Sequence, residues 1–223
     1  MNFLIIGNGF DIAHELPTSY NDFLDMCKLV RKFLFGKLGD KVSVERRYKR
    51  GKISEEEMTK VEIFAKSMGA LLSYNFQNNV SKNFWIKYFS NKRNKKKVGE
   101  KWVDFEEEIR NVLIRVRQAE ENDTNDEIIK LDADIKECIY DKKIIVYSDL
   151  YNYLFEEHKK LVLAIDIYMG YYISSIDIAK KTFFNSNSFN YVLSFNYTNT
   201  FRRLYDLNTE VCFIHGCARE IWD

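Results

Sequence analysis

Residues that could carry out chemistry gather directly after two short apolar stretches near the end of the chain. Ser194, Asn196 and Thr198 follow one stretch, and His215 and Gly216 follow the other. Open α/β sheets bind ligands at the carboxyl ends of their strands, so the two groups should meet at one edge. An amide can position a water molecule or a carboxamide, and an imidazole can accept a proton near neutral pH. We therefore predict Asn196 and His215 as catalytic residues, with Ser194, Thr198 and Gly216 as binding residues; a purely structural His215 is the alternative.

A third group of candidates follows the apolar run at the N-terminus. The sequence after Ile6 is Gly7, Asn8, Gly9, Phe10 and Asp11. A strand that breaks into Gly-x-Gly and then a helix is typical of nucleotide-binding α/β domains, because glycine allows close approach and free N–H groups bind phosphate. These five residues are predicted to hold a nucleotide. The complete G-x-G-x-x-G pattern is absent, so an ordinary strand-to-helix turn is the alternative.

Glu106 is the remaining candidate for binding the ligand. In a helix that starts near Trp102, positions 102, 106, 109, 113 and 116 share one face, and all except Glu106 are apolar. An inward carboxylate is costly unless it is paired or functional. We therefore expect Glu106 to be at least partly buried and directed toward Gly7–Gly9 or His215, as a ligand contact or as a structural ion-pair partner.

The elements that must position these residues form an α/β fold. Apolar runs predict parallel strands near 2–6, 191–195 and 211–214, with helices on both faces of the sheet, while helical spacing dominates from about 20 to 185. Residues 1–20 and 186–223 would form a Rossmann-like core, and residues 21–185 a helical insertion, in one domain. Sheets usually have more than three strands. Because only three strands are predicted and the sequence stops seven residues after His215-Gly216, we expect the chain to be C-terminally incomplete.

Local signals within the insertion predict helix limits and loops. Ser19 and Asp22 have the spacing of a capping signal at a helix start. A pattern of apolar residues from Leu150 to Ile176 predicts one long helix, interrupted by no glycine except Gly170. The basic run at 92–97 and the acidic run at 120–126 are predicted to be loops.

Composition limits the classes of protein to which the chain can belong. The 223 residues carry 34 Lys and Arg against 33 Asp and Glu, a net charge of +1 that disfavours a broad nucleic-acid surface. No apolar run approaches the roughly 18 residues of a membrane span, and the N-terminus lacks a signal peptide. The four cysteines form no C-x-x-C pair and have no metal-ligand spacing with the three histidines. We expect a cytoplasmic protein with reduced thiols and no metal.

Four motifs together resemble the AbiH family of bacteriophage abortive infection proteins. They occur in the family's order and span nearly the whole chain: Leu4 to Tyr20, Trp102-Val103-Asp104-Phe105-Glu106, Ser194 to Thr200, and Ile214-His215-Gly216. Family members generally continue well past the His-Gly motif, and this chain does not. The resemblance implies a role in defence against phage.

A more distant resemblance bears on mechanism. The spacing from Gly7 to Pro17 is similar to the sirtuin G-A-G-x-S…I-P loop, and Asn196 and His215 stand where sirtuins have T-x-N and H-G. That similarity implies a sirtuin-like fold in which Asn196 and His215 flank the nicotinamide ribose of NAD, and hydrolysis of NAD or NADP. Asp11 replaces the sirtuin serine and Thr198 an expected aspartate, and the four-cysteine zinc module is missing, which disfavours deacetylation.

Two other functions remain open from the sequence. The same pocket could serve as a nucleotide sensor whose helical insertion engages a phage component or a second copy of the chain. An inactive, truncated family member is the third possibility.

Overall fold

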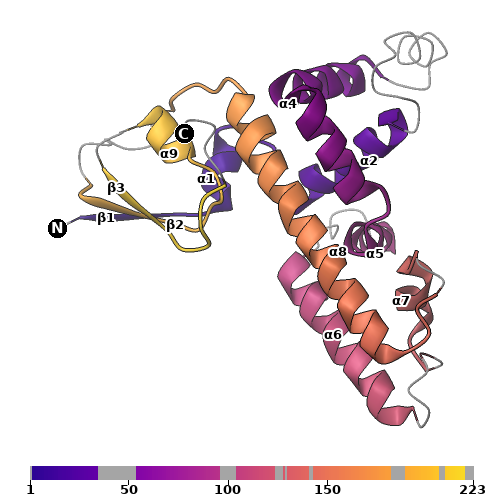
Figure 1. Ribbon diagram of the computed structural model, residues 1–223. Helices are drawn as coiled ribbons and strands as arrows, with labels where there is room; N and C mark the ends of the chain where they lie inside the picture. The colour runs from indigo at the N-terminus through magenta and orange to yellow at the C-terminus, as the bar shows by residue number, and fades with distance from the viewer. Residues whose placement is uncertain are drawn as a thin grey trace. The chain divides into compact units, whose positions relative to one another are not determined.

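The computed structural model describes residues 2–34, 54–95, 104–123, 128, 130–140, 143–181, 189–205 and 209–218. They form a mostly helical α/β structure (Figure 1). The strands are β1 (Phe3–Ile6), β2 (Tyr191–Ser194) and β3 (Glu210–Phe213). The α-helices are α1 (Asn8–Ala13), α2 (Tyr20–Leu34), α4 (Glu55–Ser81), α5 (Phe84–Lys95), α6 (Phe105–Asn122), α7 (Ala133–Cys138), α8 (Tyr147–Ile167) and α9 (Thr200–Leu204), and a π-helix, η1, spans Tyr168–Ile173.

The three strands form one parallel sheet in the order β1-β2-β3, as the apolar runs predict. Ile6 is paired in register with Ser194, and Ser194 with Phe213. Two further backbone bonds continue the ladder past the strand ends: Phe195 N–H donates to Ile6 O, and Ile214 N–H donates to Ser194 O, both at 2.9 Å. The carboxyl ends of all three strands therefore meet at one edge.

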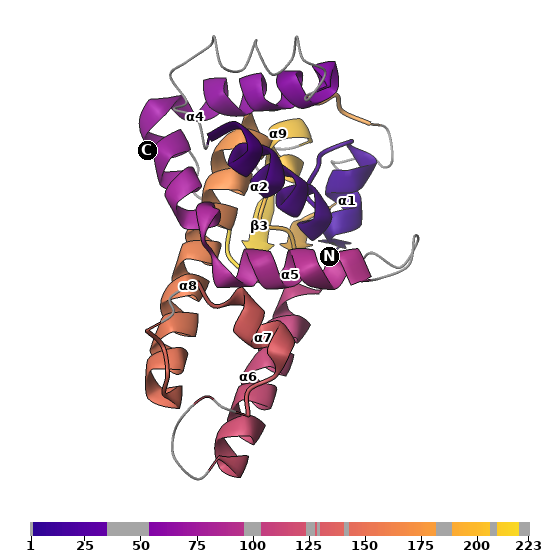
Figure 2. The same cartoon turned by 90° about the vertical axis from the view of Figure 1, so that its right-hand side faces the viewer.

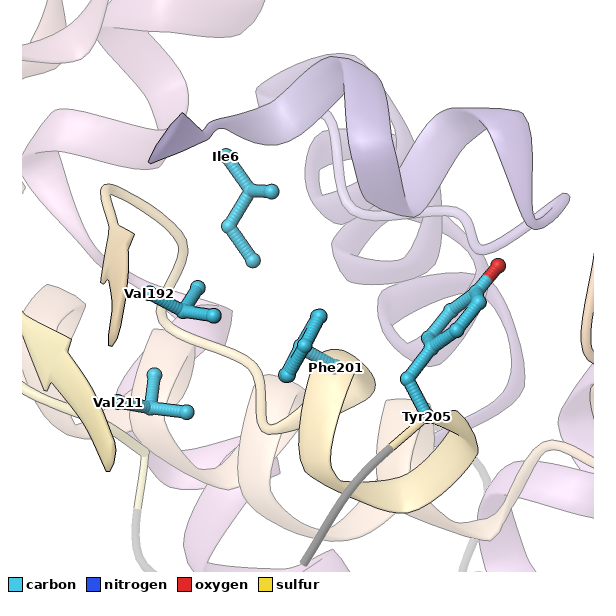
Figure 3. Close-up of a cluster of buried hydrophobic side chains, with 5 residues drawn as sticks. All are labelled: Ile6, Val192, Phe201, Tyr205 and Val211. Atoms are coloured by element: carbon cyan, nitrogen blue, oxygen red, sulfur yellow. The ribbon is translucent and has the colours of Figure 1, made fainter. Parts of the chain in front are cut away.

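One face of this sheet packs against α9. Ile6, Val192 and Val211 form a buried cluster with Phe201 and with Tyr205, which directly follows the helix (Figure 3). On the opposite face of β1 the side chains of Phe3 and Ile5 are 61% and 67% exposed. Parallel sheets are normally covered on both faces. The expectation of helices on both faces is therefore not met within the described residues.

The chain divides into two compact units. The first comprises Met1–Phe23, Val42–Ser73 and Ile165–Asp223, and so includes the sheet, α1, α9 and η1. The second comprises Leu24–Lys41 and Tyr74–Ala164. Within the second unit, α5 lies against both α6 and α7 (Figure 2). All strands and their carboxyl ends belong to the first unit, so this unit positions most of the candidate site.

The long helix predicted near 150–176 is confirmed, with a change of winding at its end. After α8 the chain continues directly into η1, which contains Gly170. The Tyr168 hydroxyl in η1 donates to Pro17 O at 2.7 Å, and its ring meets that of Phe23 edge-on at 5.5 Å. A π-helix frequently marks a functional position. Here it fixes the end of the helix to the segment that follows α1.

The core of the second unit is aromatic, with a buried carboxylate. Phe89 stacks on Phe105 with ring centroids 4.0 Å apart, and Trp85 Nε1–H donates to Leu154 O at 3.0 Å. Glu157 is 4% exposed; its Oε2 accepts from Phe84 N–H at 3.0 Å. Lys160 Nζ donates to Glu157 Oε1 at 2.7 Å, so the buried charge is paired.

Capping explains where α2 begins, and charge explains why α5 extends further than predicted. The capping signal is confirmed: Ser19 N–H donates to Asp22 Oδ2 at 3.1 Å, and Asp22 N–H donates to Ser19 Oγ at 3.2 Å. The predicted loop at 92–97 is wrong for 92–95, which form the last turn of α5. Basic residues in a last turn interact favourably with the helix dipole. Residues 96 and 97 lie outside the described residues.

The predicted acidic loop also begins later than expected. Residues 120–122 belong to α6, and Asp123 N–H closes the helix by donating to Glu120 O at 3.0 Å. Residues 124–126 lie outside the described residues. Within the part of the chain that the structure describes, no helix is long and apolar enough to cross a membrane.

Candidate functional site

The segment that leaves β2 directs every second side chain into the first unit. Ser194, Asn196, Thr198 and Thr200 are at most 7% exposed. The intervening Phe195 is 44% exposed, and Tyr197 is half-buried. Three of the polar residues predicted from the sequence therefore lie on the buried side of this strand end, together with Thr200, which was not predicted.

Asp11 of α1 meets this polar row. The Thr198 hydroxyl donates to Asp11 Oδ2 at 2.5 Å, and the Thr200 hydroxyl donates to Thr198 Oγ1 at 3.1 Å. Asp11 is 1% exposed, and its other oxygen, Oδ1, is buried with no hydrogen-bond partner. Burial raises the pKa of Asp11, against the opposing effects of the Thr198 and Thr200 hydroxyls and of His14 and Arg203. One carboxylate oxygen is thus fixed and the other is unused.

Asn196 is the second buried group with unused polar atoms. Its backbone N–H donates to Ser194 Oγ at 3.2 Å, which fixes the turn after β2. Its side chain is 4% exposed, yet neither Oδ1 nor Nδ2, both buried, has a hydrogen-bond partner among the described residues. Each unsatisfied buried polar group costs about 1–3 kcal/mol. Natural proteins pair nearly all such groups, so this amide is a candidate for contact with a ligand.

His215 lies beside the same segment but on its exposed side. Its ring centroid is 5.8 Å from that of Phe195 and 6.0 Å from that of Tyr197, the two neighbours of Asn196. The imidazole itself is exposed, and Gly216 turns the chain with a positive φ of 79°. The structure therefore brings the His-Gly turn to the Asn196 segment. Whether His215 and Asn196 open into one cleft stays a prediction.

The glycine motif forms a direct junction between β1 and α1 and has no separate loop. Gly7 is the N-cap residue, with extended backbone angles, and α1 begins at Asn8, whose Oδ1 accepts from the Thr18 hydroxyl at 2.7 Å. Apart from the glycine itself, its chain neighbours and the backbone of its own helix, no described atom lies within 4 Å of the position where a side chain on Gly7 or Gly9 would begin. Open space at both glycines is what close approach of a ligand requires. The ring of Phe10 packs against Phe201 at 6.3 Å, in the core.

The expectation that Glu106 is partly buried is wrong. Helix α6 begins at Phe105, and Asp104 Oδ1 caps it by accepting from Glu106 N–H at 3.0 Å. The buried face contains Phe105, Val112 and Val116, and the Glu106 side chain is exposed. The buried face passes through Phe105, Val112 and Val116, whereas Leu113 of the predicted face is 40% exposed, so the face on which Glu106 lies is not the buried one. Trp102 lies outside the described residues. Glu106 belongs to the second unit, and its predicted ligand contact loses its physical basis.

His14 is a buried residue near Asp11 that sequence reasoning did not assign to the site. His14 is 2% exposed; Nδ1 lies 2.7 Å from Phe10 O, and Nε2 lies 2.8 Å from the Tyr205 hydroxyl. The Tyr205 hydroxyl donates to Lys181 O at 2.6 Å. The Phe10 carbonyl oxygen can only accept, so the contact at Nδ1 is a donation from the ring. His14 lies one turn after Asp11, and its electrostatic effect on Asp11 opposes the rise in the pKa of that carboxyl.

Two further features of the described residues bear on ligands. No group of three or more His, Cys, Asp or Glu side chains among them is arranged to hold a metal ion. A hollow of about 520 Å³ lies in the second unit, lined by residues such as Lys82, Asn152 and Lys160. None of the predicted site residues lines that hollow. The candidate site is therefore defined by the buried side-chain atoms of Asp11 and Asn196 in the first unit that have no hydrogen-bond partner among the described residues.

Comparison with known proteins identifies the family. No curated protein and no solved structure matches the chain. The family model described as "Bacteriophage abortive infection AbiH" matches residues 3–222. This match includes β1, β2, β3 and the whole polar row at the sheet edge. The chain belongs to the AbiH family of bacteriophage abortive infection proteins.

Proposed function

We propose that this AbiH protein hydrolyses NAD or NADP at the bond between nicotinamide and ribose. Family membership supports a role in abortive infection of phage. The observation that carries the proposal is the Asn196 side chain, buried at the carboxyl end of a parallel strand with both polar atoms unpaired. Ligands of open α/β sheets bind at such strand ends.

The reaction needs few protein groups. The bond from ribose C1′ to nicotinamide nitrogen breaks, its electron pair leaves with nicotinamide, and the sugar passes through an oxocarbenium-like state. A water oxygen then bonds to C1′, and a proton acceptor takes the proton that the water releases. The products are ADP-ribose (or its phosphorylated form), nicotinamide and a proton. Orientation and a site closed to bulk water supply most of the acceleration in such a scheme.

The arrangement of the site supports these roles. The Asn196 amide has an unused acceptor and an unused donor, which suit a water molecule and a carboxamide or hydroxyl. Ser194 holds the turn of Asn196, and Thr198 holds Asp11, so both act as positioning residues. The open space at Gly7 and Gly9 supports close approach of the ligand backbone at the same edge. His215 is the proton acceptor that the sequence motif predicts.

A nucleotide sensor is the second candidate function. It is favoured by the exposure of His215, because a histidine beside Phe195 and Tyr197 is on the other side of the strand end from the buried Asn196. In this function NAD or NADP would bind and remain intact.

Incubation of the purified protein with NAD and with NADP, followed by chromatography for nicotinamide, separates the two functions. We expect nicotinamide release by the unmodified protein and a loss of roughly 100-fold or more in Asn196→Ala, the usual contribution of a positioned group. Asn122→Ala, an exposed amide at the end of α6, is the matched control and should retain full activity. Binding of NAD without nicotinamide release would establish the sensor and end the hydrolase proposal.

A further inference from the structure

Two buried side chains at the sheet edge hold polar atoms that no described protein group satisfies. One is the Asp11 carboxylate, through Oδ1, and the other is the Asn196 amide, through both Oδ1 and Nδ2. Both side chains are more than nine-tenths buried and belong to the first unit. Together they offer two acceptor atoms and one donor group. A ligand with several hydroxyl groups matches this set, because each hydroxyl can both donate and accept a hydrogen bond.

Thr198 places these two side chains close together. It stands two residues after Asn196, and two residues of extended chain span at most about 7 Å. Its hydroxyl contacts Asp11 at 2.5 Å. Asp11 and Asn196 are therefore close enough to reach the same small ring, although they are 185 positions apart in the sequence.

The hydroxyl row of Thr200 and Thr198 determines which atom of Asp11 is available. The Thr200 hydroxyl donates to Thr198, and the Thr198 hydroxyl donates to Asp11 Oδ2, so both protons run toward the carboxylate. Oδ2 is thereby occupied and the plane of the carboxylate is fixed. Oδ1 is the carboxylate oxygen to which no described group donates, so it is the one left for a ligand.

We infer that Asp11 and Asn196 form a subsite for the vicinal hydroxyl groups of the ribose that carries nicotinamide, and that Asp11, not His215, is the second residue that contacts these hydroxyl groups. This inference rests on the proposed function and names the part of the ligand that the edge holds. Asp11 Oδ1 accepts from one hydroxyl group, while the Asn196 amide donates to and accepts from its neighbour. Thr198 and Thr200 are positioning residues for the carboxylate.

The alternation along the strand end separates Asp11 from His215. Residues 194, 196, 198 and 200 are the buried ones of this segment, and Thr198 among them contacts Asp11 directly. His215 lies instead against Phe195 and Tyr197, the residues between them. A ligand hydroxyl bound to the Asn196 amide is therefore on the Asp11 side of the segment.

Calorimetric titration of the full chain with ADP-ribose and with ADP tests this subsite. ADP-ribose carries the second ribose and ADP does not, whereas both carry the adenosine ribose. We expect ADP-ribose to bind about 10- to 100-fold more tightly, the effect of one to two hydrogen bonds that include a charged acceptor. Asp11→Asn and Asn196→Ala should bring the affinity for ADP-ribose down to that for ADP and leave ADP binding unchanged.

Two control variants isolate the subsite from folding and from the histidine motif. Thr198→Ser keeps the hydroxyl that fixes Asp11 and should keep the preference for ADP-ribose, as should His215→Ala. Asp11→Asn preserves the shape of the side chain and its acceptor for Thr198. A thermal unfolding transition as sharp as that of the unmodified protein shows that this variant is folded.

The outcomes distinguish this inference from the proposed function. A preference for ADP-ribose that disappears in Asp11→Asn supports the subsite even if NAD is never hydrolysed, in which case only the hydrolase proposal fails. If NAD is hydrolysed but Asp11→Asn retains the preference, the subsite is overturned while the hydrolase stands. Equal affinity for ADP and ADP-ribose, binding of neither, or loss of the preference in His215→Ala alone also overturns it.

Discussion

Replacing Thr198 with valine tests the contact that assembles the site. Valine keeps the branched shape of threonine and removes the hydroxyl that donates to Asp11 Oδ2 at 2.5 Å. It also removes the acceptor of the Thr200 hydroxyl. A hydrogen bond to a charged group contributes about 1.5–3 kcal/mol, so we expect Thr198→Val to lower the free energy of unfolding by about 2 kcal/mol at pH 8. For a chain of this size that loss is a fall of about 4–8 °C in Tm.

The pH dependence of this loss follows from the ionisation of Asp11. Burial raises the pKa of Asp11 above its unfolded value, so its own titration favours the folded protein at low pH and disfavours it as pH rises. The Thr198 hydroxyl acts against this effect by stabilising the ionised form. Its contribution is therefore full above the folded-state pKa and declines below it. The loss caused by Thr198→Val should shrink from about 2 kcal/mol at pH 8 to about 1 kcal/mol once pH has fallen below the folded-state pKa of Asp11, where a bond between neutral groups remains.

Thermal and urea unfolding of four proteins at a series of pH values measures this contact. The set is the unmodified protein, Thr198→Val, Asp11→Asn and the double variant, with Thr198→Ser as a control that retains the hydroxyl. We expect a coupling free energy of at least about 1 kcal/mol at pH 8 in this double-mutant cycle. A loss in Thr198→Val that is the same at pH 8 and below the folded-state pKa of Asp11, or that Thr198→Ser reproduces, would refute the reasoning.

Three other expectations concern the rest of the chain. Arg115 donates to Asp134, and although burial of Asp134 acts in the opposite direction, this bond lowers the pKa of the Asp134 carboxyl. Arg115→Met should therefore lower the free energy of unfolding by about 1 kcal/mol at pH 7, and this loss should fade as pH falls through the folded-state pKa of Asp134. In the same urea titrations Arg117→Met, which removes only an exposed ion pair, should have no effect. Glu157→Ala removes the acceptor of the buried Phe84 N–H and should lower the free energy of unfolding by about 2 kcal/mol. Glu157→Gln can still accept that hydrogen bond and should lower it by less. Equal urea midpoints for the two variants would contradict this expectation. A thiol-reactive dye should quickly label the two exposed cysteines of the folded protein, Cys212 and Cys217. It should label the buried Cys27 and Cys138 only on unfolding, because burial both shields these thiols and raises their pKa. Quick labelling of a third cysteine would contradict the packing.

The sheet, and the edge at which its carboxyl ends meet, could be predicted from the sequence because short-range signals specify them. Each strand is a brief apolar run that ends at polar residues or glycine, and only parallel pairing brings the three ends together. The start of α2 was predictable for the same reason, since the bonds of Ser19 and Asp22 lie within one turn. Buried strands and capping boxes carry their signal within a few residues.

The parts that could not be predicted depend on long-range contacts or on which face of a helix is buried. The bond from Thr198 to Asp11 joins residues 187 positions apart, and no periodicity indicates it. For Glu106, the helix buries the face of Phe105, Val112 and Val116 and exposes Glu106. Apolar residues stand on both of these faces, so their spacing alone could not decide which one packs against the core.

The pairing of β1 with β2 has a consequence for how the protein is made. Asn2 N–H donates to Asn190 Oδ1, and the first strand has to wait until its partner 188 positions later has been synthesised. At 5–20 residues per second the ribosome needs roughly 10–40 s for that interval, during which Phe3 and Ile5 belong to an unpaired apolar segment. Asp11 meets Thr198 only after this pairing. A nascent or interrupted chain that lacks β2 therefore also lacks the contact between Asp11 and Thr198.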